Sequence, residues 1–166
     1  SAQLQPKASG IVLPSRIHAI VLISQLNEPS LKALAFARAI QPSTITALRV
    51  DTNPTRTAKL VEDWAARDIQ VPLSIVASEY RDLVEPVLSY LDRIHIGPRD
   101  VVQVFIPEYV VGHWWETILH NQSALRLKTR LLFMPAVMVT SVPYQLKSAE
   151  KVRALDAGAD DYVTKP

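Results

Sequence analysis

IHAIVLI, residues 17–23, is a short apolar run that is rich in β-branched side chains and interrupted by a single histidine. A run of this length and composition is typical of a strand that is covered on both faces, as in a parallel sheet. It is far shorter than the ~20 residues that a membrane-spanning helix requires. Residues 17–23 therefore predict the central strand of a buried sheet.

A helix is expected after this strand. Leu31, Leu34 and Ala39 recur at helical spacing. Asn27 suits an N-cap before them, and Pro42 ends the pattern. Strand patterns then return at 44–50, 71–77, 100–106 and 136–142, and helical patterns at 57–68 with Thr55 as candidate cap, at 83–91 and at 114–132.

The alternation of strands and helices with short links indicates the fold class. Such a chain builds a parallel sheet through right-handed crossovers, with helices on both faces of the sheet. We therefore predict an α/β fold, a three-layer α/β/α sandwich around a mainly parallel five-stranded sheet. The fifth strand, 136–142, is expected near an edge of the sheet, where pairing with a second copy of the chain would cover it.

Composition excludes several classes of protein. The chain of 166 residues has 18 Lys and Arg against 16 Asp and Glu, so it lacks the basic field of a nucleic-acid-binding protein, and no nucleic-acid partner is expected. The absence of cysteine excludes disulfides, thiolate zinc sites and cysteine nucleophiles, and it is compatible with the cytoplasm. The sequence starts at Ser1 without a signal peptide, and we interpret it as a fragment of a longer protein.

Three runs between residues 105 and 146 are similar to a known family. They are IPEYV at 106–110, GHWWETILHNQSALRLK at 112–128 and VMVTSVPYQL at 137–146. These runs, together with VLISQLNEPSLKALAFARAI at 21–40, resemble the cytosolic C-terminal domain of bacterial permeases of the amino-acid–polyamine–organocation superfamily. That group includes a potassium importer regulated by cyclic di-AMP. The resemblance covers residues 16–146.

The resemblance carries expectations that composition and spacing do not. It implies a universal-stress-protein-like fold, a homodimer, and regulation by an adenine nucleotide, cyclic di-AMP, rather than a resident cofactor. It also implies attachment to the chain's own transmembrane transport domain at the cytoplasmic face of the bacterial cell membrane. Residues 1–15 are then interpreted as the linker from that missing domain, 16–147 as the regulatory domain, and 148–166 as a tail.

The tail resembles a different family. EKVRALDAGADDYVTKP, residues 150–166, is similar to the last helix and strand of a response-regulator receiver, in which the lysine corresponding to Lys165 reaches a phosphorylated aspartate. A receiver also needs an acidic pair after its first strand, where this chain has Ser24 and Gln25. We therefore expect no working phospho-acceptor site and interpret the tail as artificially joined or spliced.

Polar residues follow three of the predicted strands, at the end of the sheet where parallel α/β proteins bind ligands. Ser24 and Asn27 could bond a phosphate or a base, and Asp51 could accept a hydrogen bond from a ribose hydroxyl or an adenine amine. Thr52, Asn53 and Glu108 belong to the same set of candidate ligand-binding residues. The alternative is that Asp51 and Asn53 only shape turns.

The 112–130 segment supplies the remaining candidates. His113, Glu116 and His120 share one helical face, which is compatible with a metal site or with a plain polar face, and we predict no metal. Trp114 could stack on adenine or anchor an interface. Arg126 and Arg130 lie on one side of a helix, where they could bind phosphate or remain solvated.

Missing motifs argue against catalysis. The glycine loop by which universal stress proteins bind ATP is absent, because glycine occurs only at positions 10, 97, 112 and 158. No GxGxxG, Walker or GxSxG motif is present, so we predict no enzyme and no catalytic residue. Three functions remain open: a nucleotide-sensing regulatory domain, a structural dimerisation domain without ligand, and a receiver-like signalling domain.

Overall fold

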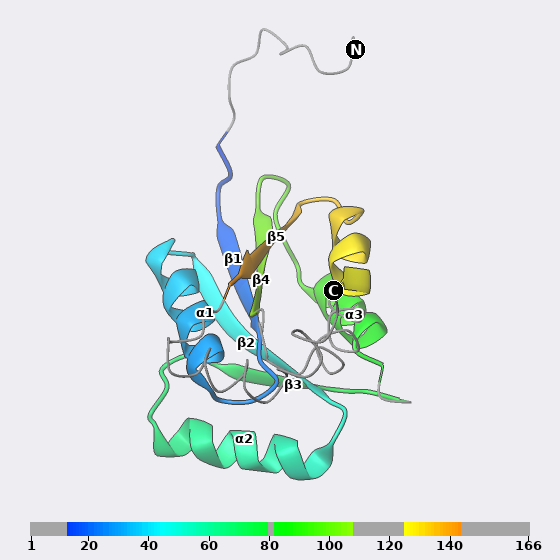
Figure 1. Ribbon diagram of the computed structural model, residues 1–166. Coiled ribbons are helices and arrows are strands. Elements are labelled where there is room, and N and C mark those ends of the chain that lie inside the picture. The colour runs from blue at the N-terminus through cyan, green and yellow to red at the C-terminus, as the bar shows by residue number, and fades with distance from the viewer. Residues whose placement is uncertain (1–12, 80–81, 108–124, 144–166) are drawn as a thin grey trace, which may run out of the picture.

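The computed structural model describes residues 13–79, 82–107 and 125–143. These residues form a five-stranded, entirely parallel sheet with the order β3-β2-β1-β4-β5 (Figure 1). The strands are β1 (Ile17–Leu22), β2 (Thr44–Asp51), β3 (Leu73–Ala77), β4 (Val101–Pro107) and β5 (Val137–Val142). The predicted fold class is confirmed, with β1 at the centre and β5 at an edge.

Helices cover both faces of the sheet. Figure 1 shows α1 (Glu28–Ala39) and α2 (Pro54–Ala66) on one side, and α3 (Val84–Arg93) with the helical residues 125–132 on the other. The arrangement is the three-layer sandwich expected from alternating strands and helices joined by short links. Among the described residues, no helix has the length and apolar character needed to cross a membrane.

The two faces of β1 contribute to separate cores. Ala19 and Val21 pack in one cluster with α1 and α2, whereas Ile20 packs in the other with α3 and with Leu127 and Leu131 of the 125–132 helix. Both faces of the strand are thus buried. This double burial explains why residues 17–23 are nearly continuous in apolar side chains instead of alternating with polar ones.

Asparagine side chains cap the first turns of α1 and α2. The Oδ1 atom of Asn27 accepts from the backbone N–H of Ser30 at 3.0 Å, which confirms the predicted cap of α1. The predicted cap of α2 is wrong: α2 begins at Pro54, and Asn53 is its N-cap rather than Thr55. Proline is favoured at the first helical position because its φ is preset and it lacks the N–H that would need a partner.

Several predicted elements lie outside the described residues. They include the linker up to residue 12, the first part of the helix predicted at 114–132, and the whole tail at 148–166. Within the described part, the last residues of that predicted helix, 125–132, are helical as expected.

Candidate functional site

Five of the described candidate residues gather where β1 and β2 end. These two strands are neighbours in register, with Leu22 opposite Leu48, so the loops that follow them lie together at the C-terminal end of the sheet. Ser24 and Asn27 belong to the first loop, and Asp51, Thr52 and Asn53 to the end of β2 and the second loop. The structure therefore brings five of the predicted residues into one region.

A buried arginine joins the two loops. Arg49, on β2, is only 5% exposed, and its Nη1 atom donates to the carbonyl oxygen of Ser24 at 2.5 Å. Its Nε atom donates to Thr57 Oγ1 at 3.1 Å, and the Thr57 hydroxyl in turn donates to Asp51 Oδ1 at 2.8 Å. A continuous polar chain thus connects the end of β1, the end of β2 and the first turns of α2.

The polar chain around Arg49 contains both positive and negative groups. Burial lowers the pKa of Arg49 from its usual value, Asp51 acts in the opposite direction, and Arg56 lowers it further. A guanidinium nevertheless keeps its proton in proteins. The first turn of α2 has no acidic residue, so no side chain of that turn offsets the positive end of the helix dipole beside Arg49. The region consequently favours an anionic group.

The asparagines in these loops act as helix caps. Asn27 Oδ1 accepts from Ser30, and Asn53 Oδ1 accepts from the backbone N–H of Arg56 at 3.1 Å. The hydroxyl of Ser30 also donates to the carbonyl oxygen of Gln25 at 2.5 Å, which fixes the loop after β1. Helix capping therefore engages the side-chain oxygen of each asparagine, and for Asn53 this agrees with the alternative of a local structural role.

The two arginines of the 125–132 helix lie in the other helical layer. Arg130 forms an ion pair with Glu85 of α3, with 3.2 Å between Nη1 and Oε1 and more than half of each side chain exposed. Arg126 is exposed on the same helix. Among the described residues, neither arginine forms a hydrogen bond or ion pair with Ser24 or Asp51, which lie where α1 and α2 begin. Glu108, His113, Trp114 and His120 lie outside the described residues.

Two shallow hollows lie away from the strand ends. One, of about 290 Å³, is bounded by α3 and the 125–132 helix and includes Arg130. The other, of about 420 Å³, lies between β3 and α3 and contains none of the predicted residues; it is lined by Ser74, Ile75, Val76, Tyr90, Arg93 and Ile94. Arg49 and Asp51 line neither hollow. The polar chain around Arg49 thus lies outside both hollows.

Arg49 was missed by reasoning from sequence alone. The available signal is a lone arginine between Leu48 and Val50 in a strand that is otherwise free of charge until Asp51. Arginine is almost never fully buried unless it is paired. An arginine inside a central strand therefore indicates a partner nearby, although its position does not identify that partner.

Comparison with known proteins adds two findings. The family model described as the KimA potassium transporter C-terminal domain matches residues 16–144. The chain is also 30% identical, over 119 residues, to the potassium transporter KimA of Bacillus subtilis (strain 168). That alignment covers 70% of this chain but 19% of the transporter, so the chain spans about a fifth of the length of this relative.

Proposed function

Because the chain belongs to the family of KimA potassium transporter C-terminal domains, we propose that it is the cytosolic regulatory domain of a potassium transporter. The name of the bacterial relative supports potassium as the transported ion. The transporter's own transmembrane domain would be the main partner of this domain. No catalytic step forms part of the proposed role.

We further propose that the domain senses an adenine nucleotide, cyclic di-AMP, at the C-terminal end of the sheet. The observation that carries this proposal is the polar chain from Ser24 through Arg49 to Asp51. A buried guanidinium and the start of α2 suit the negative charge of a phosphodiester. Asp51 has a second carboxylate oxygen that could accept from an adenine amine. The choice of cyclic di-AMP rests on the family resemblance.

A homodimer would complete this site. β5 is an edge strand, and the side chain of Met138 on it is 53% exposed. Exposed edge strands are usually paired or covered. A dinucleotide with twofold symmetry suits a twofold dimer, because each half of the ligand can meet the same groups of one subunit. Arg126 of the second subunit would then be available to the site.

A structural dimerisation domain without ligand is the second candidate. The observation in its favour is that the polar groups at the strand ends already satisfy one another. Arg49 bonds Ser24 and Thr57, Asp51 bonds Thr57, and Asn53 caps α2. On this alternative, the polar chain only stabilises the loops.

Isothermal titration calorimetry on the 166-residue chain separates the two functions. Cyclic di-AMP, AMP and ATP would be titrated in turn into protein whose fold is verified by circular dichroism and whose mass is verified by sedimentation. Saturable heat with cyclic di-AMP that is absent with AMP supports the sensing role. A folded dimer that gives no heat with cyclic di-AMP at several temperatures leaves the structural role standing.

A further inference from the structure

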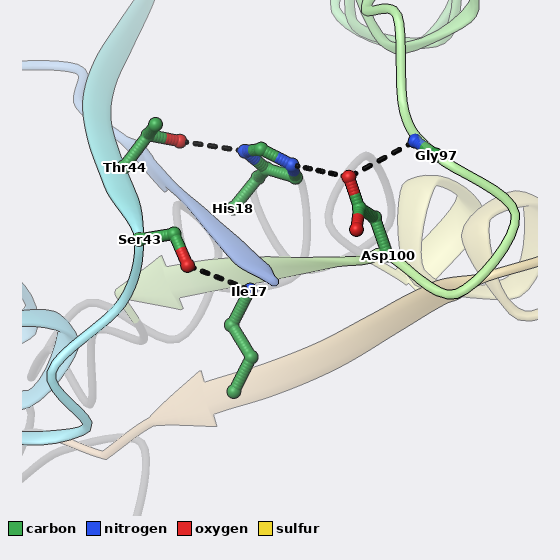
Figure 2. Close-up of polar contacts among 6 residues, drawn as sticks. All are labelled: Ile17, His18, Ser43, Thr44, Gly97 and Asp100. Carbon is green, nitrogen blue, oxygen red and sulfur yellow. Dashed lines mark hydrogen bonds and ion pairs between the residues drawn. The ribbon is translucent and has the colours of Figure 1, made fainter. Parts of the chain in front are cut away.

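A second polar cluster lies at the opposite end of the sheet, where β1 begins (Figure 2). His18 pairs in register with Thr44 on β2, and its Nδ1 atom lies 2.8 Å from Thr44 Oγ1. Its Nε2 atom lies 3.2 Å from Oδ2 of Asp100, just before β4. Only 13% of the histidine side chain and 10% of the aspartate side chain are exposed. The imidazole therefore bridges β2 and the start of β4.

The chemistry of the partners fixes the proton positions on the ring. An ionised carboxylate only accepts hydrogen bonds, so Nε2 carries a proton and donates to Asp100. In the neutral ring, Nδ1 accepts from the hydroxyl of Thr44. When Nδ1 gains a proton, that hydroxyl can rotate and accept instead. Both protonation states keep two hydrogen bonds, but only the protonated ring forms an ion pair with Asp100.

Asp100 is held in its ionised state by the turn that contains it. The backbone N–H of Gly97 donates to Asp100 Oδ2 at 2.9 Å, and the N–H of Asp100 donates to the carbonyl oxygen of Gly97 at 3.0 Å. The Gly97 bond, followed by the His18 bond, lowers the pKa of Asp100 below its usual range. A Cβ atom at position 97 would lie 3.2 Å from Oδ2, so glycine permits this close approach.

The same turn holds the chain as it enters the domain. The N–H of Ser15 donates to the carbonyl oxygen of Arg99 at 2.8 Å, and Arg99 Nη2 donates to the carbonyl oxygen of Leu13 at 2.8 Å. The N–H of Val101 donates to the carbonyl oxygen of Arg16 at 3.0 Å. Residues 13–16 are thus fixed by the two residues that flank Asp100.

Few charges surround the imidazole. Asp100 contacts it directly, and Arg16 acts electrostatically on Asp100 from the entering segment. In the described part of the chain, no other titratable side chain forms a hydrogen bond or ion pair with His18. The protonation of the His18 ring therefore decides whether its contact with Asp100 is a hydrogen bond from a neutral ring or an ion pair.

We propose that His18 makes the attachment of residues 13–16 to the 97–100 turn sensitive to protons, so that the segment is held more tightly when the imidazole is protonated. Histidine is the side chain that exchanges its proton near neutral pH in proteins. The ion pair with Asp100 exists only while both ring nitrogens carry a proton. This property needs no nucleotide, so it goes beyond the proposed function.

Amide hydrogen exchange, followed by NMR on the 166-residue chain, tests the proposal. The amides to follow are those of Ser15 and Val101, with rates corrected for intrinsic exchange, between about pH 5.5 and 8. We expect their protection factors to fall by about threefold across this range, the effect of a weak ion pair. Protection factors that stay constant with pH would overturn the proposal.

Two variants and one control assign the effect to the ring. His18→Gln keeps hydrogen-bonding groups but cannot take up a proton, so its protection factors should be independent of pH. His95→Gln removes an exposed histidine and should retain the response of the parent chain. If His18→Gln does not fold, Asp100→Asn removes the charge at nearly the same shape and should also abolish the response. If folded His18→Gln or folded Asp100→Asn keeps the pH dependence of the parent chain's protection factors, the proposal is wrong.

Discussion

Arg49 donates from its guanidinium to the carbonyl oxygen of Ser24, which lies 25 positions earlier in the chain, across the boundary between β2 and the end of β1. This bond ties the loop after β1 to a rigid strand rather than to another loop. Precise placement of a ligand-binding loop depends on such support by the scaffold.

Replacing Arg49 should destabilise the fold. Arg49→Met fills most of the side-chain volume but leaves the Ser24 carbonyl oxygen and the Thr57 hydroxyl without this donor. We expect the free energy of unfolding to fall by about 1–3 kcal/mol, the cost of losing the partner of a buried polar group. Urea denaturation measures the change. Arg38→Met, at an exposed position in the last turn of α1, is the control and should change stability little.

The cap of α2 can be tested by a pair of substitutions. Asn53→Ala removes the oxygen that accepts from the N–H of Arg56, and the free energy of unfolding should fall by about 0.5–2 kcal/mol. Thr55→Ala, two positions later, removes no capping bond and should be close to neutral. A larger loss from Thr55→Ala than from Asn53→Ala, measured by thermal or urea denaturation, would contradict the cap seen in the structure.

Binding of cyclic di-AMP should depend on Asp51 at the end of β2. Asp51→Ala removes a carboxylate at the strand ends and should weaken binding by about 1–3 kcal/mol, the range for a hydrogen bond to a charged group. Asp63→Ala removes an exposed carboxylate that pairs with Lys59, and it should leave affinity unchanged. Both affinities are measured by calorimetry on folded variants.

Arg126→Ala provides a separate test of the dimeric site. Arg126 belongs to the helix that packs with α3, on the face of the sheet opposite α2, and in the proposed dimer it would reach the ligand from the second subunit. We expect weakened binding with an intact dimer. Unchanged affinity would restrict the site to the loops after β1 and β2 of a single subunit.

The dimer should be sensitive to charge on one edge of the sheet. Met138→Lys places an ammonium group on β5, where it would be buried by pairing with a second subunit, and edge lysines discourage such pairing. Sedimentation should then show a monomer. Ile75→Lys makes the same change on β3, the opposite edge strand, where Ile75 is 45% exposed. A dimer that Ile75→Lys breaks and Met138→Lys does not would place the interface on β3.

Asp100 should contribute to the pH dependence of folding in acid. Its pKa is lowered in the folded state by Gly97 and His18, so the unfolded chain binds a proton more readily than the folded chain. The resulting stabilisation is present above about pH 4, the normal range for an aspartate, and is lost as the pH falls through the lower folded value. Asp100→Asn should therefore lose less stability than the parent between about pH 5 and 3, as measured by urea denaturation.

The sequence predicted the sheet because its information is local. Residues 17–23 are apolar on both faces, and β1 is indeed buried on both faces at the centre of the sheet. The cap of α2 was misplaced by two residues because Asn53, Thr55 and Pro54 are all compatible with a helix start. Only the backbone geometry shows that the helix begins at Pro54.

The polar contacts were less accessible from sequence because they join distant positions. His18 and Asp100 are 82 positions apart, and Ser24 and Arg49 are 25 apart. Their contacts follow from strand order and register, which residue patterns leave open. Asp51 and Ser24 were identified by the rule that ligands bind at the C-terminal ends of parallel strands. That rule places residues in a region but does not show which atoms bond.

β1 links the two polar clusters mechanically. His18 stands near its start and Ser24 just beyond its end, six positions later, which is about 20 Å in an extended strand. The strand is hydrogen-bonded along both edges and packed on both faces, so it is among the stiffest parts of the domain. A displacement of one end of so stiff an element would be expected to move the other end as well. Strand β1 therefore forms a stiff connection between residues 13–16, where the chain enters the domain, and the loops after β1 and β2.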